Sequence, residues 1–169
     1  ANGGPGEVHI SGGNVYAYNF ANRWAIPSSA IGGGSSEKSI GSLGKVTIDG
    51  GYVYAYSDLG TAIGGGSSKT LTGGNANITI SGGQVIAKSG QGAGIGGGSS
   101  RTGGGIVVGN SYNGGTATIN ISGNPIIRTG SIGGGITGDP TGKLGYAKIN
   151  VSGGDIQAQF VMEAGSTGT

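Results

Sequence analysis

Residues 45–56 read Lys45-Val-Thr-Ile-Asp-Gly-Gly-Tyr-Val-Tyr-Ala-Tyr56, and residues 62–68 read Ala62-Ile-Gly-Gly-Gly-Ser-Ser68. In the first stretch, apolar and polar side chains alternate on both sides of a Gly-Gly pair. This is the pattern of two short β-strands joined by a tight corner. The second stretch adds one apolar side chain before a run of glycines. A unit of this length cannot bury its own apolar face, so the fold depends on whether the unit recurs.

Both stretches recur along nearly the whole chain. The first occurs at residues 7–18, 45–56, 77–88, 118–129 and 148–159. The second occurs at residues 30–36, 62–68, 94–100 and, in shortened form, 131–135. Stacked copies of such a unit bury a continuous core, and their matching strands pair in parallel. The sequence therefore predicts an all-β fold, a single-stranded parallel β-helix (β-solenoid) of about five coils, with the right-handed winding usual for parallel crossovers.

We expect one β-solenoid domain over residues 1–169, with repeats at roughly residues 3–40, 41–72, 73–113, 114–144 and 145–169. Stacking predicts inward columns of equivalent apolar residues. They are Val8, Val46, Ile78, Ile119 and Ile149; Ile10, Ile48, Ile80, Ile121 and Val151; Val15, Val53, Val85, Ile126 and Ile156; and Ile31, Ile63, Ile95 and Ile132. Arg128 falls in a further column, of alanines. A buried unpaired charge is costly, so we expect a local bulge there or a guanidinium that reaches outward.

The composition supports order and excludes several classes of protein. Glycine supplies 44 of 169 residues, against a usual share of roughly 7%; its recurrence at fixed positions predicts positive φ or close backbone approach. With 9 basic and 7 acidic residues, the chain lacks the dense basic surface of nucleic-acid-binding proteins. No apolar run is long enough to predict insertion in a membrane. Cysteine is absent, which excludes disulfides and thiolate metal sites.

The pairing of Ile-x-Ile-x-Gly-Gly-x-Val-x-Ala with Ala-Ile-Gly-Gly-Gly resembles Gly-rich repeats of large secreted or surface-anchored bacterial proteins. It is also similar to the β-helical carbohydrate-binding domains of polysaccharide-degrading clostridia. The resemblances cover nearly the whole chain and imply an extracellular or cell-surface setting. They also imply a polysaccharide or a cell-surface glycan as partner. The second family holds calcium with acidic loop residues, and such Asp-rich loops are missing here, so we expect neither a metal nor a cofactor.

Five tyrosines occupy predicted outward positions of the second strand in the first two repeats: Tyr16, Tyr18, Tyr52, Tyr54 and Tyr56. Neighbouring strands lie about 4.8 Å apart, so these side chains would form one aromatic surface. Aromatic faces stack on sugar rings, and the phenol keeps a hydrogen-bonding group. The surface therefore predicts glycan binding, with Trp24 as a further candidate. Alternatively, the tyrosines only suit a strand surface, or residues 19–27, which include Phe20 and Trp24, cover them.

The Gly-Gly-Gly-Ser-Ser stretches are a second candidate site. Stacking would expose backbone amides, a ladder of serines and the basic residues that follow them: Ser35, Ser67 and Ser99, with Lys38, Lys69 and Arg101. Backbone amides in such turns can bind anions, so this ladder predicts contact with a linear anionic polymer. The alternative is a tight corner with solvated charges beside it. A nucleotide-binding phosphate loop is excluded, because that motif needs Gly-Lys-Ser/Thr opening a helix.

Catalytic residues are not predicted. None of the acidic residues recurs between repeats as the paired carboxylates of a glycosidase would, and the only histidine, His9, lies on a predicted outward position. The sequence therefore favours a non-catalytic module that combines structural extension with adhesion or glycan binding. Two alternatives stay open. One is a fibre or stalk subunit that self-assembles by end-to-end stacking of coils, and the other is a β-helix carbohydrate-active enzyme.

Overall fold

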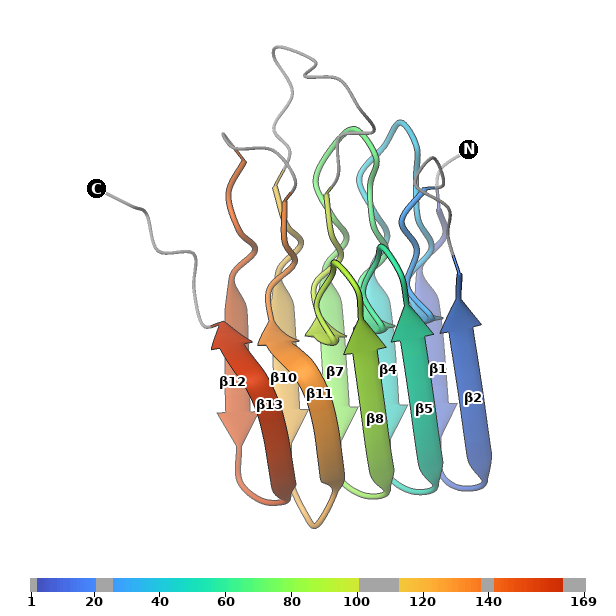
Figure 1. The fold of residues 1–169 in the computed structure, drawn as a ribbon, viewed down its shortest axis with the longest axis vertical. Helices are drawn as coiled ribbons and strands as arrows, with labels where there is room; N and C mark the ends of the chain where they lie inside the picture. The colour runs from blue at the N-terminus through green and yellow to red at the C-terminus, as the bar shows by residue number, and fades with distance from the viewer. Residues whose placement is uncertain (1–2, 21–25, 101–112, 138–141, 163–169) are drawn as a thin grey trace, which may run out of the picture.

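The computed structural model describes residues 3–20, 26–100, 113–137 and 142–162, and the regular elements of these residues are all β-strands. Sheet A takes one strand from each repeat, paired in parallel and in repeat order (Figure 1). Its strands are β1 (Gly6–Ile10), β4 (Gly44–Ile48), β7 (Ala76–Ile80), β10 (Ala117–Ile121) and β12 (Ala147–Val151). Within the described ranges there is no helix long and apolar enough to cross a membrane.

Sheet B holds the second strand of each repeat, again parallel and in repeat order. These strands are β2 (Asn14–Asn19), β5 (Tyr52–Ser57), β8 (Gln84–Ser89), β11 (Ile126–Gly133) and β13 (Asp155–Met162). A third, shorter row pairs β3 (Ile31–Gly32), β6 (Ile63–Gly64) and β9 (Ile95–Gly96), and it joins sheet B because β9 pairs with the end of β11. The chain is thus a stack of similar repeats.

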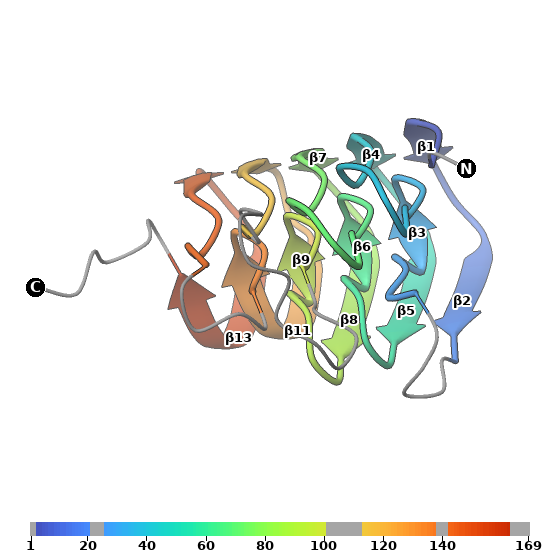
Figure 2. The same cartoon turned by 90° about the horizontal axis from the view of Figure 1, so that it is seen from above.

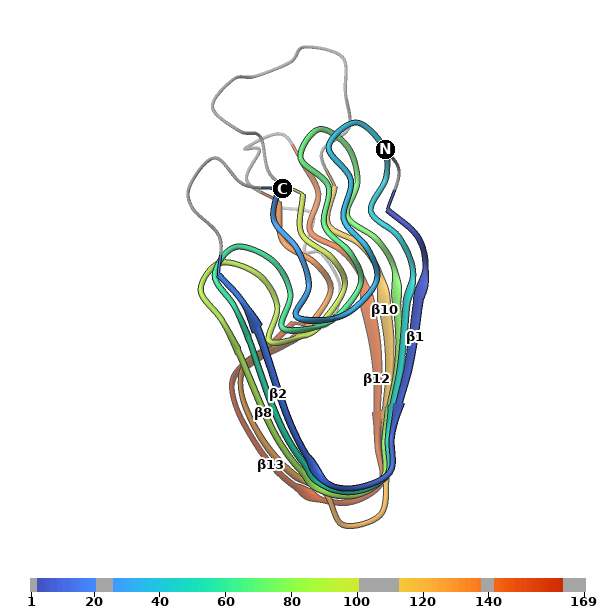
Figure 3. The same cartoon turned by 90° about the vertical axis from the view of Figure 1, so that its right-hand side faces the viewer.

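The core lies between the two sheets. Seen along the stack, sheets A and B form two walls that meet at the Gly-Gly corner, and the short third row closes the space between them (Figure 3). The view from above shows β3, β6 and β9 lying in this third row, one beside the next (Figure 2). Isoleucine and valine fill the core, as β-branched side chains on a pleated surface do. Fully buried members include Val46, Ile48, Ile63, Ile78 and Ile80.

The strand register confirms most of the predicted columns. In sheet A, Val8 pairs with Val46, which pairs with Ile78, and the column continues through the remaining repeats. In the third row, Ile31 pairs with Ile63, which pairs with Ile95. The inward columns are thus set by sequence position, and each apolar residue packs on its equivalent in the next repeat.

The prediction for Ile126 was wrong. Ile127, not Ile126, pairs with Val85 and Ile156, while Ile126 lies opposite Gln84 and is 41% exposed. The corner of the fourth repeat is one residue longer than the others and contains Pro125, so the side chains that follow it are displaced by one position as far as Thr129, whereas Ile132 lies opposite Ile95 as predicted.

The same displacement resolves the position of Arg128. Arg128 pairs with Ile86 and Gln157 on the outward face, and Thr129 takes the place in the alanine column. The extra corner residue is the expected local bulge, and the side chain of Arg128 lies on the outer face instead of in the core.

Close approach of the repeats explains the triple glycines. Gly64 has a φ of +146°, and a Cβ added there would overlap the carbonyl oxygen and carbon of Gly96 in the next repeat. A residue with a side chain fits neither that backbone conformation nor that space. The structure thus confirms the expectation that the recurring glycines permit positive φ and close packing of backbone on backbone.

Candidate functional site

The outer face of sheet B carries a continuous aromatic surface, which we call the aromatic patch: Tyr16, Tyr18, Phe20, Tyr52, Tyr54 and Tyr56. The rings contact one another diagonally across β2 and β5, with centroids 5.6 Å apart for Tyr16 and Tyr52 and 5.5 Å apart for Tyr18 and Tyr54. Tyr16 and Tyr18 are 59% and 53% exposed. The structure therefore brings the five predicted tyrosines together and leaves ring surface open to solvent.

Phe20 belongs to the patch rather than covering it. Its ring stacks on Tyr18 with a centroid distance of 5.6 Å and an interplanar angle of 13°, and its centroid lies 5.7 Å from that of Tyr56. Phe20 is itself 74% exposed. Phe20 was expected, as one alternative, in a loop that covers the tyrosines, because it follows the last alternating strand position. Trp24 lies outside the described residues.

Tyr56 is fixed by a hydrogen bond at the edge of the patch. Its phenol donates to Oδ1 of Asp58 over 2.6 Å. This hydrogen bond, with smaller contributions from burial and from the negative charge of Asp58, raises the pKa of Tyr56 above its ordinary value of 10.0. The hydrogen bond ties the phenol end of the Tyr56 ring to Asp58 at the edge of the patch.

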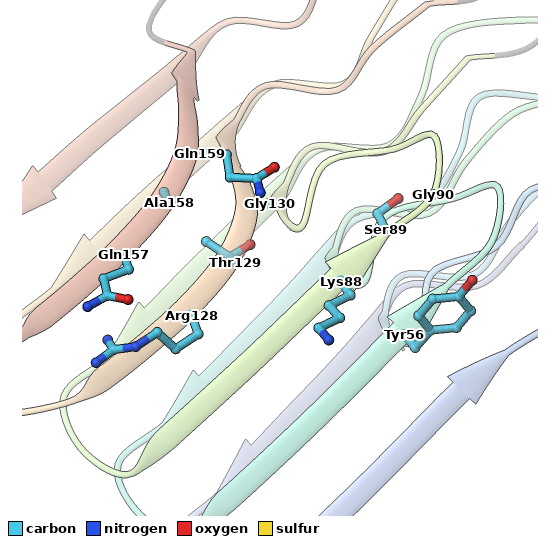
Figure 4. A pocket seen from close by; sticks show the side chains of 10 residues that line it. All are labelled: Tyr56, Lys88, Ser89, Gly90, Arg128, Thr129, Gly130, Gln157, Ala158 and Gln159. Carbon is cyan, nitrogen blue, oxygen red and sulfur yellow. The ribbon is translucent and has the colours of Figure 1, made fainter.

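A groove of about 590 Å³ continues the outer face of sheet B beyond the patch (Figure 4). It begins at Tyr56 and crosses β8, β11 and β13. Its lining residues are Tyr56, Lys88, Ser89, Gly90, Arg128, Thr129, Gly130, Gln157, Ala158 and Gln159. Aromatic, basic and amide side chains therefore share one face, across β5, β8, β11 and β13.

The groove exists because the later repeats lack a loop. In the third repeat, residues 88–94 separate the inward Ala87 from the inward Ile95, whereas in the fourth only residues 130–131 separate Thr129 from Ile132. The long loop stands beside the groove at Ser89 and Gly90, and the shortened connection leaves the space next to it open. The groove was not predicted from the sequence, although the shortened spacing is visible there.

Two basic residues of the groove are held in place differently. Lys88 places its Nζ 5.8 Å from the ring centroid of Tyr54, within the range of a cation–π contact. Arg128 donates to Oδ2 of Asp155 over 2.6 Å and to the backbone carbonyl of the same residue over 3.0 Å. Lys88 therefore connects the aromatic patch to the groove, while Arg128 is fixed against the fifth repeat.

The predicted serine ladder is largely buried, so the expectation that it forms an exposed surface was wrong. Ser67 and Ser99 are fully or almost fully buried, and Ser35 is partly buried. The Oγ of Ser35 accepts a hydrogen bond from the backbone N–H of Ser67 over 3.2 Å, and Ser67 does the same for Ser99 over 3.3 Å. These hydroxyls therefore join consecutive repeats.

The basic residues beside that ladder do not form a row of free cations. Lys69 lies 3.4 Å from Oε1 of Glu37 in the preceding repeat, and Lys38 is exposed. Arg101 lies outside the described residues. Anion binding along this edge therefore has less support than the sequence suggested.

The acidic side chains in the described ranges are all engaged. Besides the Asp58, Asp155 and Glu37 contacts, Glu7 accepts from Lys45 over 2.6 Å and Asp49 lies 2.8 Å from His9. His9 is on the outward face, as predicted. No group of three or more potential metal-ligating side chains is found among the residues that the structure describes.

A family model described as a beta helix repeat matches residues 8–35, 46–67 and 78–99, which lie in the first three repeats. The chain therefore has the fold of a β-helix repeat protein. No match was found among curated proteins or among solved structures.

Proposed function

We propose that this β-helix repeat protein is a non-catalytic extracellular module of a bacterial surface or secreted protein, and that it binds a polysaccharide through the aromatic patch. In this proposal the chain is a right-handed stack of five coils that also serves as a structural extension. Its partners are a glycan on one face and neighbouring domains at its ends. The proposal includes neither a cofactor nor a metal.

The observation that carries the proposal is the exposed, preformed aromatic patch. Soluble proteins seldom leave contiguous aromatic surface in water without a use for it. The rings lie on a sheet, so binding does not require them to be ordered first, and each tyrosine offers a hydroxyl beside its apolar face. A sugar ring has the matching character, with apolar C–H faces and a polar rim.

The acidic residues support a non-catalytic role. Glycosidases depend on two carboxylates that face the same substrate. Here Glu7, Asp49 and Asp155 are each paired with a basic residue or histidine of an adjacent repeat, and Asp58 accepts from Tyr56. These carboxylates already have structural partners.

A glycan array tests the proposal. The unmodified protein should be retained on at least one polysaccharide, and the Tyr18→Ala/Tyr54→Ala variant should lose that retention while its far-ultraviolet circular dichroism stays unchanged. Substitution of Thr47 by Ala, on the outer face of sheet A, is the matched control and should bind normally. The proposal fails if the unmodified protein binds no glycan. Release of sugar from a bound polysaccharide would instead indicate a carbohydrate-active enzyme.

Self-assembly by end-to-end stacking is the second candidate. Val151, Phe160 and Val161 of the fifth repeat are exposed large apolar side chains, and β12 and β13 each pair with one neighbouring strand in the described ranges. Strand edges of this kind can accept a further strand. Sedimentation at increasing protein concentration would reveal such assembly, and a monomer at all concentrations would exclude it.

A further inference from the structure

We infer that a linear polysaccharide runs along the stack, from the aromatic patch into the groove, and that Gly130 determines specificity by keeping the groove open for a sugar ring. This inference rests on the proposed glycan-binding function and adds a second subsite to it. It also fixes the direction of the ligand, which would cross the strands of sheet B rather than follow them.

Gly130 is a glycine that the fold itself does not require. At most described glycines, an added Cβ would meet backbone atoms of a neighbouring repeat, but at Gly130 no atom lies within 4 Å of that position. Gly130 is also absent from the set of glycines with positive φ. Glycine weakens a strand because it has no side chain to pack. Its presence within β11 therefore calls for another explanation.

The position of Gly130 supplies that explanation. Thr129 and Ser131 pair with Ala158 and Phe160 of β13, so Gly130 lies opposite Gln159. Successive side chains alternate between the two faces of a strand, which places Gly130 on the same outward face as Arg128. Both line the groove. A side chain at position 130 would therefore project into the space between the loop of the third repeat and the outer side chains of β13.

The polar residues of the groove suit the hydroxyl groups of a sugar. Lys88 of β8 and Gln157 and Gln159 of β13 are exposed, on the two strands that flank β11 (Figure 4). Ammonium and amide groups donate hydrogen bonds, and the amides also accept them. Binding sites commonly combine such groups with apolar surface, which Gly130 and Ala158 supply here.

The spacing of the strands favours a polymer over a single sugar. Adjacent strands lie about 4.8 Å apart, which is close to the length that one sugar ring adds to an extended polysaccharide. The patch occupies β2 and β5, the groove occupies β8, β11 and β13, and Tyr56 and Lys88 stand between them. A chain lying across the strands would thus meet aromatic rings first and polar groups afterwards.

Binding of oligosaccharides of increasing length tests this inference. Isothermal titration would use disaccharides to octasaccharides of cellulose, xylan, mannan, chitin and polygalacturonate, taking the series that the unmodified protein binds. Affinity should rise with length until both subsites are filled. Gly130→Val should then reduce the affinity for the longest member about tenfold or more, because the added side chain occupies the groove. Affinity for the shortest member that binds at the patch should not change.

Two controls make the outcome decisive. Gly12→Val makes the same chemical change at another position with no atom within 4 Å of the added Cβ, in the first corner and away from the groove, and it should leave all affinities unchanged. Thermal unfolding should show both variants folded. Equal affinities of Gly130→Val and unmodified protein for every length would overturn the inference while leaving the proposed function intact. Absence of binding by the unmodified protein to any series would refute both.

Discussion

Replacement of Gly64 by alanine should destabilise the protein strongly, even though it adds a single methyl group. Gly64 combines a φ of +146° with close backbone contact, because its Cβ would overlap the carbonyl group of Gly96. The methyl group cannot move away by a change of rotamer. The overlap can be relieved only if the second and third repeats separate locally.

The cost follows from these two effects. A residue with a side chain held in such a backbone conformation costs about 1–3 kcal/mol. Separation of the repeats also weakens two backbone hydrogen bonds, from Ile63 N–H to the Gly94 carbonyl and from Gly65 N–H to the Gly96 carbonyl, both 3.0 Å. Each such bond contributes about 0.5–1.5 kcal/mol. The expected loss is therefore about 2–6 kcal/mol, a large share of the total stability of an ordinary domain, about 5–15 kcal/mol.

Chemical denaturation monitored by circular dichroism measures this loss as a lower midpoint. Gly130→Ala is the matched control, because the same methyl group meets no atom there, and its midpoint should stay the same or rise slightly, as favourable Gly→Ala substitutions do. Equal midpoints for the Gly64→Ala variant and the unmodified protein would refute the reasoning, since they would mean that the repeats are not packed closely through this backbone contact.

Two further predictions concern charged and titrating groups. The Glu7–Lys45 pair joins the first two repeats on the surface, so a double-mutant cycle with Glu7→Gln and Lys45→Met should give a coupling of about 0.2–1 kcal/mol that shrinks with added salt; a coupling that does not depend on salt would contradict a surface ion pair. The hydrogen bond to Asp58 raises the pKa of Tyr56 in the folded protein, so folding is favoured while the phenol is neutral. This contribution to stability is fully present below pH 10 and is lost as the pH rises from there through the raised pKa. Phenolate absorbance should show one tyrosine titrating late, and Asp58→Asn should restore an earlier titration; an unchanged curve in that variant would exclude Asp58 as the cause.

The parallel stack could be predicted from the sequence because its determinants repeat. The pairing of Val8 with Val46 and Ile78 depends only on equivalent positions in successive repeats. Where a repeat departs from the pattern, the prediction fails. The additional corner residue beside Pro125 displaces the first part of β11 by one position, and the similarity between repeats does not show at which residue the alternation restarts after the corner.

The site was predicted in part. The tyrosines alternate within strands, so their common face follows from the period of the strand, and ring contacts such as Tyr16–Tyr52 agree with it. Ser67 and Ser99 lie in a corner without alternation, and the sequence could not tell whether their hydroxyls face water or the neighbouring repeat. The groove depends on a loop that is missing, which is a difference between repeats and not a motif in any one of them.

The hydrogen bonds between repeats allow the number of repeats to change. Ile31 N–H donates to Ala62 of the next repeat and Ile63 N–H donates to Gly94 of the one after, in the same geometry. A duplicated central repeat would meet the same donors and acceptors on both sides, because each repeat contacts its neighbours alone. The outer face of sheet B would lengthen by one strand, about 4.8 Å, and its existing surface would be preserved. The number of repeats would then set the length of the molecule, and duplication of a repeat could change that length without changing the contacts in the core.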